Sequence, residues 1–314
     1  MKAQEILSGE NRTFRMFQTL YRGVGIRKHG LALLSGPKQV KEILRDFPDR
    51  CEGLILRKDQ DVFDWILPDN IQRYRLAGQL FRNLDIYGTD QPILLVRAGR
   101  FPAWDAEEWP EGCTLFVPFQ DPVNVGSIIR SAAAFGVSRI VLLKEAAHPF
   151  HHKSTRVAGS TLFRVPIFEG PPIRGLRRAR APLIAMSPVG KDAGRFRFPP
   201  TFGLLPGLEG PGIPAGVKSE VTLSIPMEPG VESLNSALAV GIMLYLWRRG
   251  VGEAGKMGLT GVPPETNENN PADGNPPSAL IREKERKHAF SNKETSRYPK
   301  TKRRAQQSKP KSRR

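Results

Sequence analysis

The stretch that decides the fold runs from Asp121 to Gly136 and reads DPVNVGSIIRSAAAFG. An apolar run, Cys113 to Pro118, precedes it, and a second apolar run, Arg139 to Leu143, follows it. Strand, turn, helix and strand in this order make a βαβ unit, which implies parallel strands and a right-handed crossover. The stretch therefore predicts an α/β fold.

The expected helix carries a few polar residues among many apolar ones. Asn124 is a good N-cap residue, and Gly126 lets a backbone or a ligand approach closely. Ser127, Arg130 and Ser131 form a single polar stripe at helical spacing. On this stretch alone the stripe favours an ordinary solvated face, along which Arg130 extends to water.

The chain of 314 residues is long enough for two domains with extensions. Residues 1–100 alternate short apolar runs with amphipathic stretches, which predicts a small α/β domain, with a helix expected from Asn70 to Phe81. Residues 101–112 are rich in Pro, Gly and acids and are predicted to be a linker. Residues 113–252 form the second domain, and residues 253–314 are predicted to be a disordered basic tail.

The amino-acid composition indicates which kind of partner the protein binds and in which cellular compartment it works. The net charge is +17, and residues 281–314 hold fourteen Lys or Arg and three Glu, so that +6 remains for the other 280 residues. This excess favours an anionic partner, nucleic acid first, although a solubilising tail is the simpler account of the C-terminus. Two isolated cysteines, the lack of an apolar leader and an apolar run too short to cross a bilayer predict a cytoplasmic protein without disulfides or a membrane contact.

Three histidines, His148, His151 and His152, lie within five residues. Metal binding is the alternative to a structural role here, but no Cys or acidic cluster lies nearby and the spacing is not a usual zinc pattern. We therefore expect no metal and a loop that leads into a short helix.

A second informative stretch, PGLEGPGIP, follows the predicted strand at Phe202–Leu205. Gly207, Gly210 and Gly212 flank Glu209, so backbone amides and carbonyls could close on a ligand. The stretch lacks the phosphate-binding patterns GxGxxG and GK[ST]. Alone, it is as well explained as a plain connection between two elements.

The third stretch is VTLSIPMEPGVESLNSALAVGIMLYLWRRG, from Val221 to Gly250. It predicts a strand, a loop and then a helix from Ser233 to about Arg249. A helix this apolar on all sides must be buried in the core or against a second subunit. Ser233 and Asn235 could simply satisfy amides of its first turn.

Taken together, NxGxxxR, GxEGxG and the pair IPM and SLN, in this order, closely resemble the three motifs of the TrmH/SpoU branch of the SPOUT methyltransferases. The resemblance covers residues 113 to about 250. The N-terminal region also resembles the ribosomal-protein-like RNA-binding domain that often precedes this catalytic domain. The resemblance implies a C-terminal α/β domain with a trefoil knot, a homodimer, S-adenosylmethionine as cofactor and methylation of a ribose 2′-hydroxyl in RNA.

The resemblance also implies roles for individual residues. The catalytic set would be Asn124, Arg130, Glu209, Ser233 and Asn235. The cofactor would contact, largely through backbone, Leu205, Gly207, Glu209, Gly210, Ile225, Met227, Ser233 and Leu234. The sequence departs from the family pattern where SLNVS becomes Ser233-Leu-Asn-Ser-Ala237 and where Pro206 precedes the Gly-x-Glu. Because a guanidinium is a poor base, Arg130 is expected to grip a phosphate and to stabilise developing negative charge.

Three other functions stay open at this point. A non-catalytic RNA-binding or ribosome-assembly protein could keep the same fold. A dehydrogenase-like enzyme would need a phosphate-binding fingerprint that the sequence does not contain. A base-directed methyltransferase of the same fold is the third, and the NxGxxxR and SLN motifs favour ribose over it. Ribosomal and transfer RNA are both possible substrates, with ribosomal RNA slightly favoured by the N-terminal resemblance.

Overall fold

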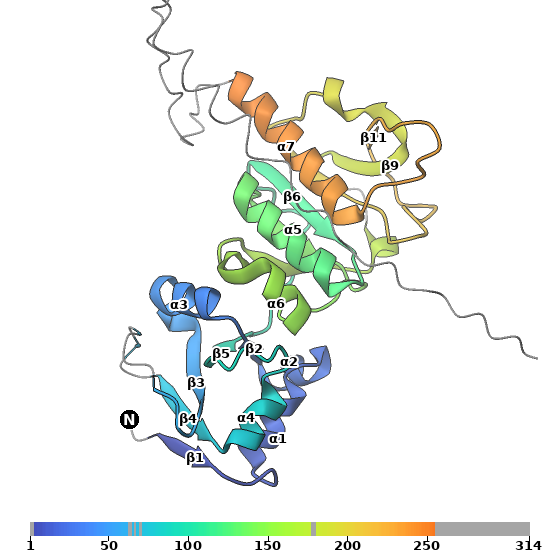
Figure 1. Ribbon diagram of the computed structural model, residues 1–314. Coiled ribbons are helices and arrows are strands. Elements are labelled where there is room, and N and C mark those ends of the chain that lie inside the picture. The colour runs from blue at the N-terminus through green and yellow to red at the C-terminus, as the bar shows by residue number, and fades with distance from the viewer. Residues whose placement is uncertain (1–2, 62–64, 66, 69–70, 177–179, 255–314) are drawn as a thin grey trace, which may run out of the picture. The chain divides into compact units, whose positions relative to one another are not determined.

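The computed structural model describes residues 3–61, 65, 67–68, 71–176 and 180–254 (Figure 1). Nearly all of the predicted basic tail, residues 253–314, lies outside these ranges, as do residues 177–179 of the basic stretch Arg174–Arg180. Among the described helices, none combines the length and the apolar character that crossing a bilayer requires.

The described N-terminal residues form a mixed five-stranded sheet in the order β1-β4-β3-β5-β2. The strands β1, β3 and β4 are parallel, and β5 runs antiparallel to both β2 and β3. The strands are β1 (Gln4–Ile6), β2 (Leu31–Leu34), β3 (Cys51–Arg57), β4 (Gln72–Leu76) and β5 (Ile93–Arg97). The helices are α1 (Arg12–Thr19), α2 (Gly23–His29), α3 (Pro37–Asp46), the 3₁₀ turn η1 (Pro48–Arg50) and α4 (Gly78–Leu84).

The prediction of a helix from Asn70 to Phe81 was wrong. Residues 72–76 form β4, which lies between β1 and β3. The side chain of Tyr74 occupies the space beside Gly53, where a Cβ would meet the tyrosine ring at 2.7 Å. Long-range strand pairing therefore overrides the local helical preference of this stretch.

The second sheet has six parallel strands in the order β11-β9-β10-β6-β7-β8 among the described residues. The pairing of β6 with β7 confirms the predicted βαβ unit. The strands are β6 (Gly112–Val117), β7 (Arg139–Leu142), β8 (Ile167–Glu169), β9 (Leu183–Asp192), β10 (Thr201–Leu205) and β11 (Val221–Ser224). Between them lie α5 (Pro122–Phe135), α6 (His152–Ala158), the 3₁₀ turns η2 (Gly159–Phe163), η3 (Ile173–Gly175) and η4 (Ala193–Arg195), and finally α7 (Ser236–Ala254).

The two faces of the second sheet are covered differently. On one face α5 and α7 lie side by side over the strands, as Figure 1 shows, and bury residues such as Ile128 and Val240. On the other face Trp104 and Trp109 pack against Phe116 of β6. The stretch predicted as a linker, residues 101–112, is therefore part of this packing, and Ala103 forms a bridge with Glu169.

Alternating side-chain direction explains this arrangement. In β6, Cys113, Leu115 and Val117 share the helix-covered face, whereas Phe116 points to the opposite face. Both faces must be apolar because parallel sheets are covered on both sides. The loops that follow the strands all emerge at one edge, the carboxyl edge, where ligand sites of such sheets usually form.

Candidate active site

The glycine-rich stretch after β10 forms a tight turn with Glu209 near its tip. Leu208 and Gly212 exchange two backbone hydrogen bonds, with N···O distances of 2.9 and 3.0 Å. Gly210 and Gly212 have φ values of +88° and +72°, which favour glycine. At Gly207 a Cβ would lie 2.8 Å from the backbone of Gly212, so the two arms of the turn close against each other.

The turn is tied to the beginning of α5. Asn124 Nδ2 donates to Glu209 Oε1 at 2.5 Å, and the backbone N–H of Asp121 donates to Oε2 at 3.2 Å. Asp121, rather than the predicted Asn124, is the N-cap residue, because its carboxylate accepts from the N–H of Val123 and Pro122 occupies the first helical position. Asn124 is consequently free to direct its side chain at Glu209.

The third stretch joins the same cluster through Asn235. Its Nδ2 donates to Asn124 Oδ1 at 3.1 Å, while its Oδ1 accepts from the N–H of Leu238 at 3.1 Å. Helix α7 therefore begins at Ser236 after Asn235, three residues later than predicted, and Ser233 does not cap it. Glu209, Asn124 and Asn235 form an unbroken hydrogen-bonded series, which we call the amide chain, between the glycine-rich turn and the last helix.

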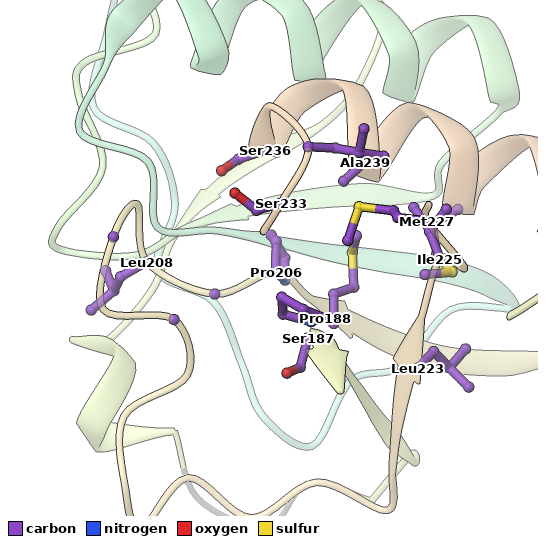
Figure 2. Close-up of a pocket in the computed structure, with 16 residues that line it drawn as sticks. Ser187, Pro188, Pro206, Leu208, Leu223, Ile225, Met227, Ser233, Ser236 and Ala239 are labelled. Atoms are coloured by element: carbon purple, nitrogen blue, oxygen red, sulfur yellow. The ribbon is translucent and has the colours of Figure 1, made fainter. Parts of the chain in front are cut away.

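A cavity of about 210 Å³ lies beside this chain (Figure 2). Figure 2 shows that its walls converge from the middle of β9, the turn after β10, β11 with the segment after it, and the start of α7. Backbone and apolar side chains make most of its surface. It is lined by Met186, Ser187, Pro188, Pro206, Gly207, Leu208, Gly210, Gly212, Leu223, Ile225, Met227, Ser233, Leu234, Ser236, Ala239 and Met243.

Most of the residues predicted to contact a cofactor lie in this wall. They are Gly207, Gly210, Ile225, Met227, Ser233 and Leu234. Two predicted residues lie elsewhere: Leu205 is fully buried in β10, and Glu209 turns toward α5. The motif reading missed Met186, Ser187 and Pro188, although they lie on the neighbouring strand β9, and parallel strands bring their carboxyl ends together.

Arg130 lies apart from the amide chain. Its Nη1 donates to the carbonyl of Val157, in the last turn of α6, at 3.0 Å, and its side chain is exposed. Asn124 and Arg130 are six residues apart on one helix, so their side chains leave the axis about 120° apart and about 9 Å along it. Within one chain the structure thus brings together Asn124, Glu209 and Asn235, with Ser233 in the cavity wall, but not Arg130.

The three histidines after β7 have structural partners. The Nδ1 atoms of His148 and His151 accept the backbone N–H groups of Phe150 and Lys153, so His151 caps α6 through its ring. Burial lowers the pKa of His148 to about 4 and also lowers the pKa of His151. Neutral rings that accept backbone hydrogen bonds explain why this short stretch is rich in histidine. No cluster of metal-ligating side chains occurs among the residues with described positions.

The part of the chain that contains the amide chain and the cavity is similar to known proteins. The model of the SpoU rRNA Methylase family matches residues 114–245. This part of the chain belongs to that family. The family resemblance predicted from the three motifs is thereby confirmed, and the matched segment contains the amide chain and the cavity.

Individual relatives extend beyond this segment. A Syntrophobacter fumaroxidans protein named ribosomal RNA small subunit methyltransferase G 2 is 44% identical over 247 residues, which are 78% of this chain and 49% of that protein. The chain thus spans about half the length of this relative. The 23S rRNA (guanosine(2553)-2′-O)-methyltransferase of Bacillus subtilis is 26% identical over 248 residues, 77% of this chain and 98% of that protein.

Among solved structures, an AdoMet-bound rRNA methyltransferase from Sinorhizobium meliloti has a TM-score of 0.66 and 23% sequence identity. The match covers 79% of this chain and 98% of that one. The likeness shows a shared fold and includes the N-terminal region as well as the SpoU segment, residues 114–245.

Proposed function

We propose that the protein transfers a methyl group from S-adenosylmethionine to a ribose 2′-hydroxyl in structured RNA. Membership of the SpoU family supports RNA methylation as the reaction class. The names of several relatives, including the Bacillus subtilis enzyme, support ribosomal RNA and the 2′-oxygen. The two cysteines of the chain are free and buried, in keeping with a cytoplasmic site of action.

The observation that carries the proposal is the amide chain beside a cavity. Three separate stretches of the chain meet there through side-chain hydrogen bonds that join residues 85 and 111 positions apart. A structural role alone would not require a carboxylate, two amides and a hydroxyl to gather at the rim of a hollow. The non-catalytic alternative explains the fold equally well, but it does not explain this convergence.

The cavity suits S-adenosylmethionine in its chemistry. Its wall combines flexible apolar side chains, Met186, Met227 and Met243, with backbone from the glycine-rich turn. An adenine ring and a thioether-like chain match such a surface, and backbone N–H and C=O groups can fix their polar atoms. Gly207, Leu208, Gly210, Ile225, Met227 and Leu234 would hold the cofactor. When bound, the cofactor supplies a methyl group that is attached to a positively charged sulfur. After the transfer this sulfur is a neutral thioether, which is the leaving group.

The residues of this chain then have to position the ribose and stabilise the negative charge that develops on its 2′-oxygen. Glu209 accepts two N–H bonds, which fix its carboxylate at the rim of the cavity. Through Asn124 it also fixes the amide of Asn235. We assign these groups, with the hydroxyl of Ser233, the task of holding the 2′-hydroxyl in line with the methyl group, since positioning supplies most of the gain in such a transfer.

Arg130 completes the proposal as the phosphate-binding group. A guanidinium stays protonated at neutral pH, so it stabilises negative charge and does not accept the proton. Because one chain directs Arg130 away from Asn124, we propose that a second copy supplies it in a homodimer. The exposed apolar side chains Leu238 and Tyr245, 55% and 53% exposed and seven residues apart on α7, favour this face as the contact between copies.

The path of the chain after β10 belongs to the same proposal. We propose that the turn, β11 and the segment before α7 are threaded as a trefoil knot, as the family resemblance implies. The order of β9, β10 and β11 in the sheet supports a non-sequential path, because β11 pairs with β9 and not with β10. Such threading would hold the cavity wall rigid.

Labelling and mapping test the reaction. RNA from a strain that lacks the protein is incubated with the full chain and S-adenosylmethionine labelled in the methyl group. We expect one labelled nucleotide whose phosphodiester resists alkali, because a 2′-O-methyl group removes the attacking oxygen. Label recovered on a base would instead identify a base-directed enzyme. No label, with no heat of cofactor binding in calorimetry, would identify a non-catalytic protein.

A further inference from the structure

The described residues line a second and larger hollow at the opposite edge of the second sheet. Its volume is about 1000 Å³, against about 210 Å³ for the cavity. Its walls come from the segment before β10 and from the last described turns of α7. Gly112 and Ser138, at the beginnings of β6 and β7, form its floor, so it lies at the amino edge of the sheet.

A short alternating pattern, Arg195-Phe-Arg-Phe198, builds one wall. Phe196 and Phe198 pack against the core, with ring centroids 5.2 Å apart, and Phe198 lies 5.2 Å from Phe202. Because side chains of an extended segment alternate in direction, Arg195 and Arg197 are left exposed. The two phenylalanines thus act as anchors that present two guanidinium groups to the hollow.

The other wall is the end of α7. Phe202 packs on Trp247 with a centroid distance of 5.7 Å, which joins the helix to the phenylalanine anchors. Arg248 lies 5.6 Å from the Trp247 ring, and Arg249 follows it in the lining. We call the hollow bordered by Arg195, Arg197, Arg248 and Arg249 the arginine groove. Glu111 is the single acid among its described lining residues.

The kinds of groups in the groove indicate what it can bind. Arginine forks match phosphate oxygens, and four arginines border the groove, of which Arg195 also forms an exposed ion pair with Asp192 at 3.6 Å. Trp247 is only 4% exposed, and Phe196 and Phe198 pack against the core, so these aromatic rings are not placed to stack on RNA bases. Phosphate contacts without base contacts give affinity and orientation, and no sequence reading.

We propose that the arginine groove binds the sugar-phosphate backbone of the RNA, away from the nucleotide that is methylated. The RNA as partner rests on the proposed function. The continuation of the chain favours the same partner, since residues 281–314, with fourteen Lys or Arg and three Glu, follow α7 in the sequence.

The position of the groove also bears on the class of RNA. The five residues of β10 separate the groove from the turn that carries Glu209, a strand length of about 16 Å. A molecule that touches both edges must therefore extend over several nucleotides. The proposal thus favours an RNA segment of several nucleotides over a single nucleotide as the bound unit.

The test compares salt dependence of RNA binding by full-length variants. The probe is fluorescently labelled double-stranded RNA of arbitrary sequence, titrated at several salt concentrations. Each lost phosphate contact lowers the slope of log affinity against log salt by about 0.7–0.9. We expect Arg195→Gln/Arg197→Gln, and separately Arg248→Gln/Arg249→Gln, to lower the slope by about 1–2 and to weaken binding about tenfold or more.

A charge-matched control makes the test specific. Arg174→Gln/Lys218→Gln removes the same charge from exposed positions of the SpoU segment outside the groove. An unchanged slope in the groove variants, or an equal loss in the control, would overturn the proposal. Calorimetry with S-adenosylmethionine separates this result from the proposed function: groove variants should bind the cofactor as the wild type does, whereas a wild type without cofactor heat would refute the methyltransferase and leave the RNA result standing.

Discussion

At the carboxyl edge of the second sheet, uncharged amides and turned backbone hold a single carboxylate through short, directional hydrogen bonds. At the amino edge, four arginines border a groove beside the aromatic contacts of Phe196, Phe198, Phe202 and Trp247. The first arrangement holds its groups in one geometry, which suits chemistry, and the second can accept many positions of an anionic partner. Variants at the two edges should therefore differ in kind: loss of turnover without salt dependence at one, and loss of salt-dependent affinity at the other.

The largest effect should come from Arg130, which belongs to neither arrangement within one chain. We expect Arg130→Ala to abolish methylation, a loss of about a thousandfold or more, while cofactor affinity changes by less than about tenfold. Turnover is measured by methyl transfer and affinity by calorimetry. A variant that keeps most of its turnover would remove Arg130 from the mechanism.

Mixed dimers show which copy supplies Arg130. Co-expressed Arg130→Ala and Asn124→Ala chains can place both intact residues at one site of a mixed dimer only if Arg130 acts across the contact. We expect such mixtures to regain turnover that neither parent variant has. Mixtures as inactive as their parents would mean that Arg130 serves the site of its own chain.

The amide chain should give the next largest effect. Asn124→Ala removes the donor to Glu209 and the acceptor for Asn235 together, and we expect turnover to fall about a hundredfold. Ser127→Ala is the matched control, because this neighbouring hydroxyl donates to the carbonyl of Val123 within α5. The loss should persist unchanged at high salt, unlike that of the groove variants. A salt-dependent loss in Asn124→Ala would erase the distinction between the two edges.

The sequence predicted this site better than it predicted its surroundings. The order of strand, turn, helix and strand predicted the βαβ unit, and the family resemblance implied that Asn124, Glu209 and Asn235 would meet. The helix caps were not predicted correctly. Asp121 before Pro122 is the ordinary N-cap pattern of α5, and because the prediction gave this role to Asn124, it missed that the Asn124 side chain can bond Glu209. Likewise, the last helix was predicted to begin at Ser233, although it begins at Ser236 and Ser233 precedes it in the cavity wall.

Other features could not be read from local sequence. The strand β4 depends on space left by Gly53 on a neighbouring strand, which no local pattern reports. The apolar stretch Leu162–Phe168 resembles a single strand, but Leu162 and Phe163 end the 3₁₀ turn η2 and only Ile167–Glu169 pair with β7, since Pro166 cannot donate to a ladder. The arginine groove joins two segments about fifty residues apart, so its charge is concentrated only by the fold.

Helix packing behind the carboxyl edge should respond to a single methyl group. A Cβ at Gly126 would lie 2.4 Å from the backbone oxygen of Ser154 on α6, which cannot easily move. We expect Gly126→Ala to lower the free energy of unfolding by about 2–3 kcal/mol. At Gly241 of α7 the nearest atom, Ser131 Oγ, is 3.8 Å away, so Gly241→Ala should be neutral or stabilise by up to about 1 kcal/mol. Urea unfolding measures both, and equal effects would contradict the close approach of α5 and α6.

The smallest effect concerns acid stability near the carboxyl edge, at the buried ring of His148. Burial holds the pKa of His148 at about 4, below its usual 6.5, and its Nδ1 accepts the N–H of Phe150 at 3.2 Å. The unfolded chain therefore binds a proton at higher pH than the folded one, and this residue's contribution is complete above about pH 6.5 and is lost as the pH falls to about 4.

The substitution His148→Asn isolates this contribution. The Oδ1 atom of the new asparagine can accept the N–H of Phe150, and an asparagine does not titrate between pH 4 and 6.5. We expect the variant to be less stable than the wild type near pH 7, and the difference to shrink by about 1–3 kcal/mol between pH 6.5 and 4. Urea unfolding across this range measures it. A difference that stays constant with pH would mean that the ring binds its proton equally well in the folded and the unfolded chain, so that burial does not lower the pKa of His148.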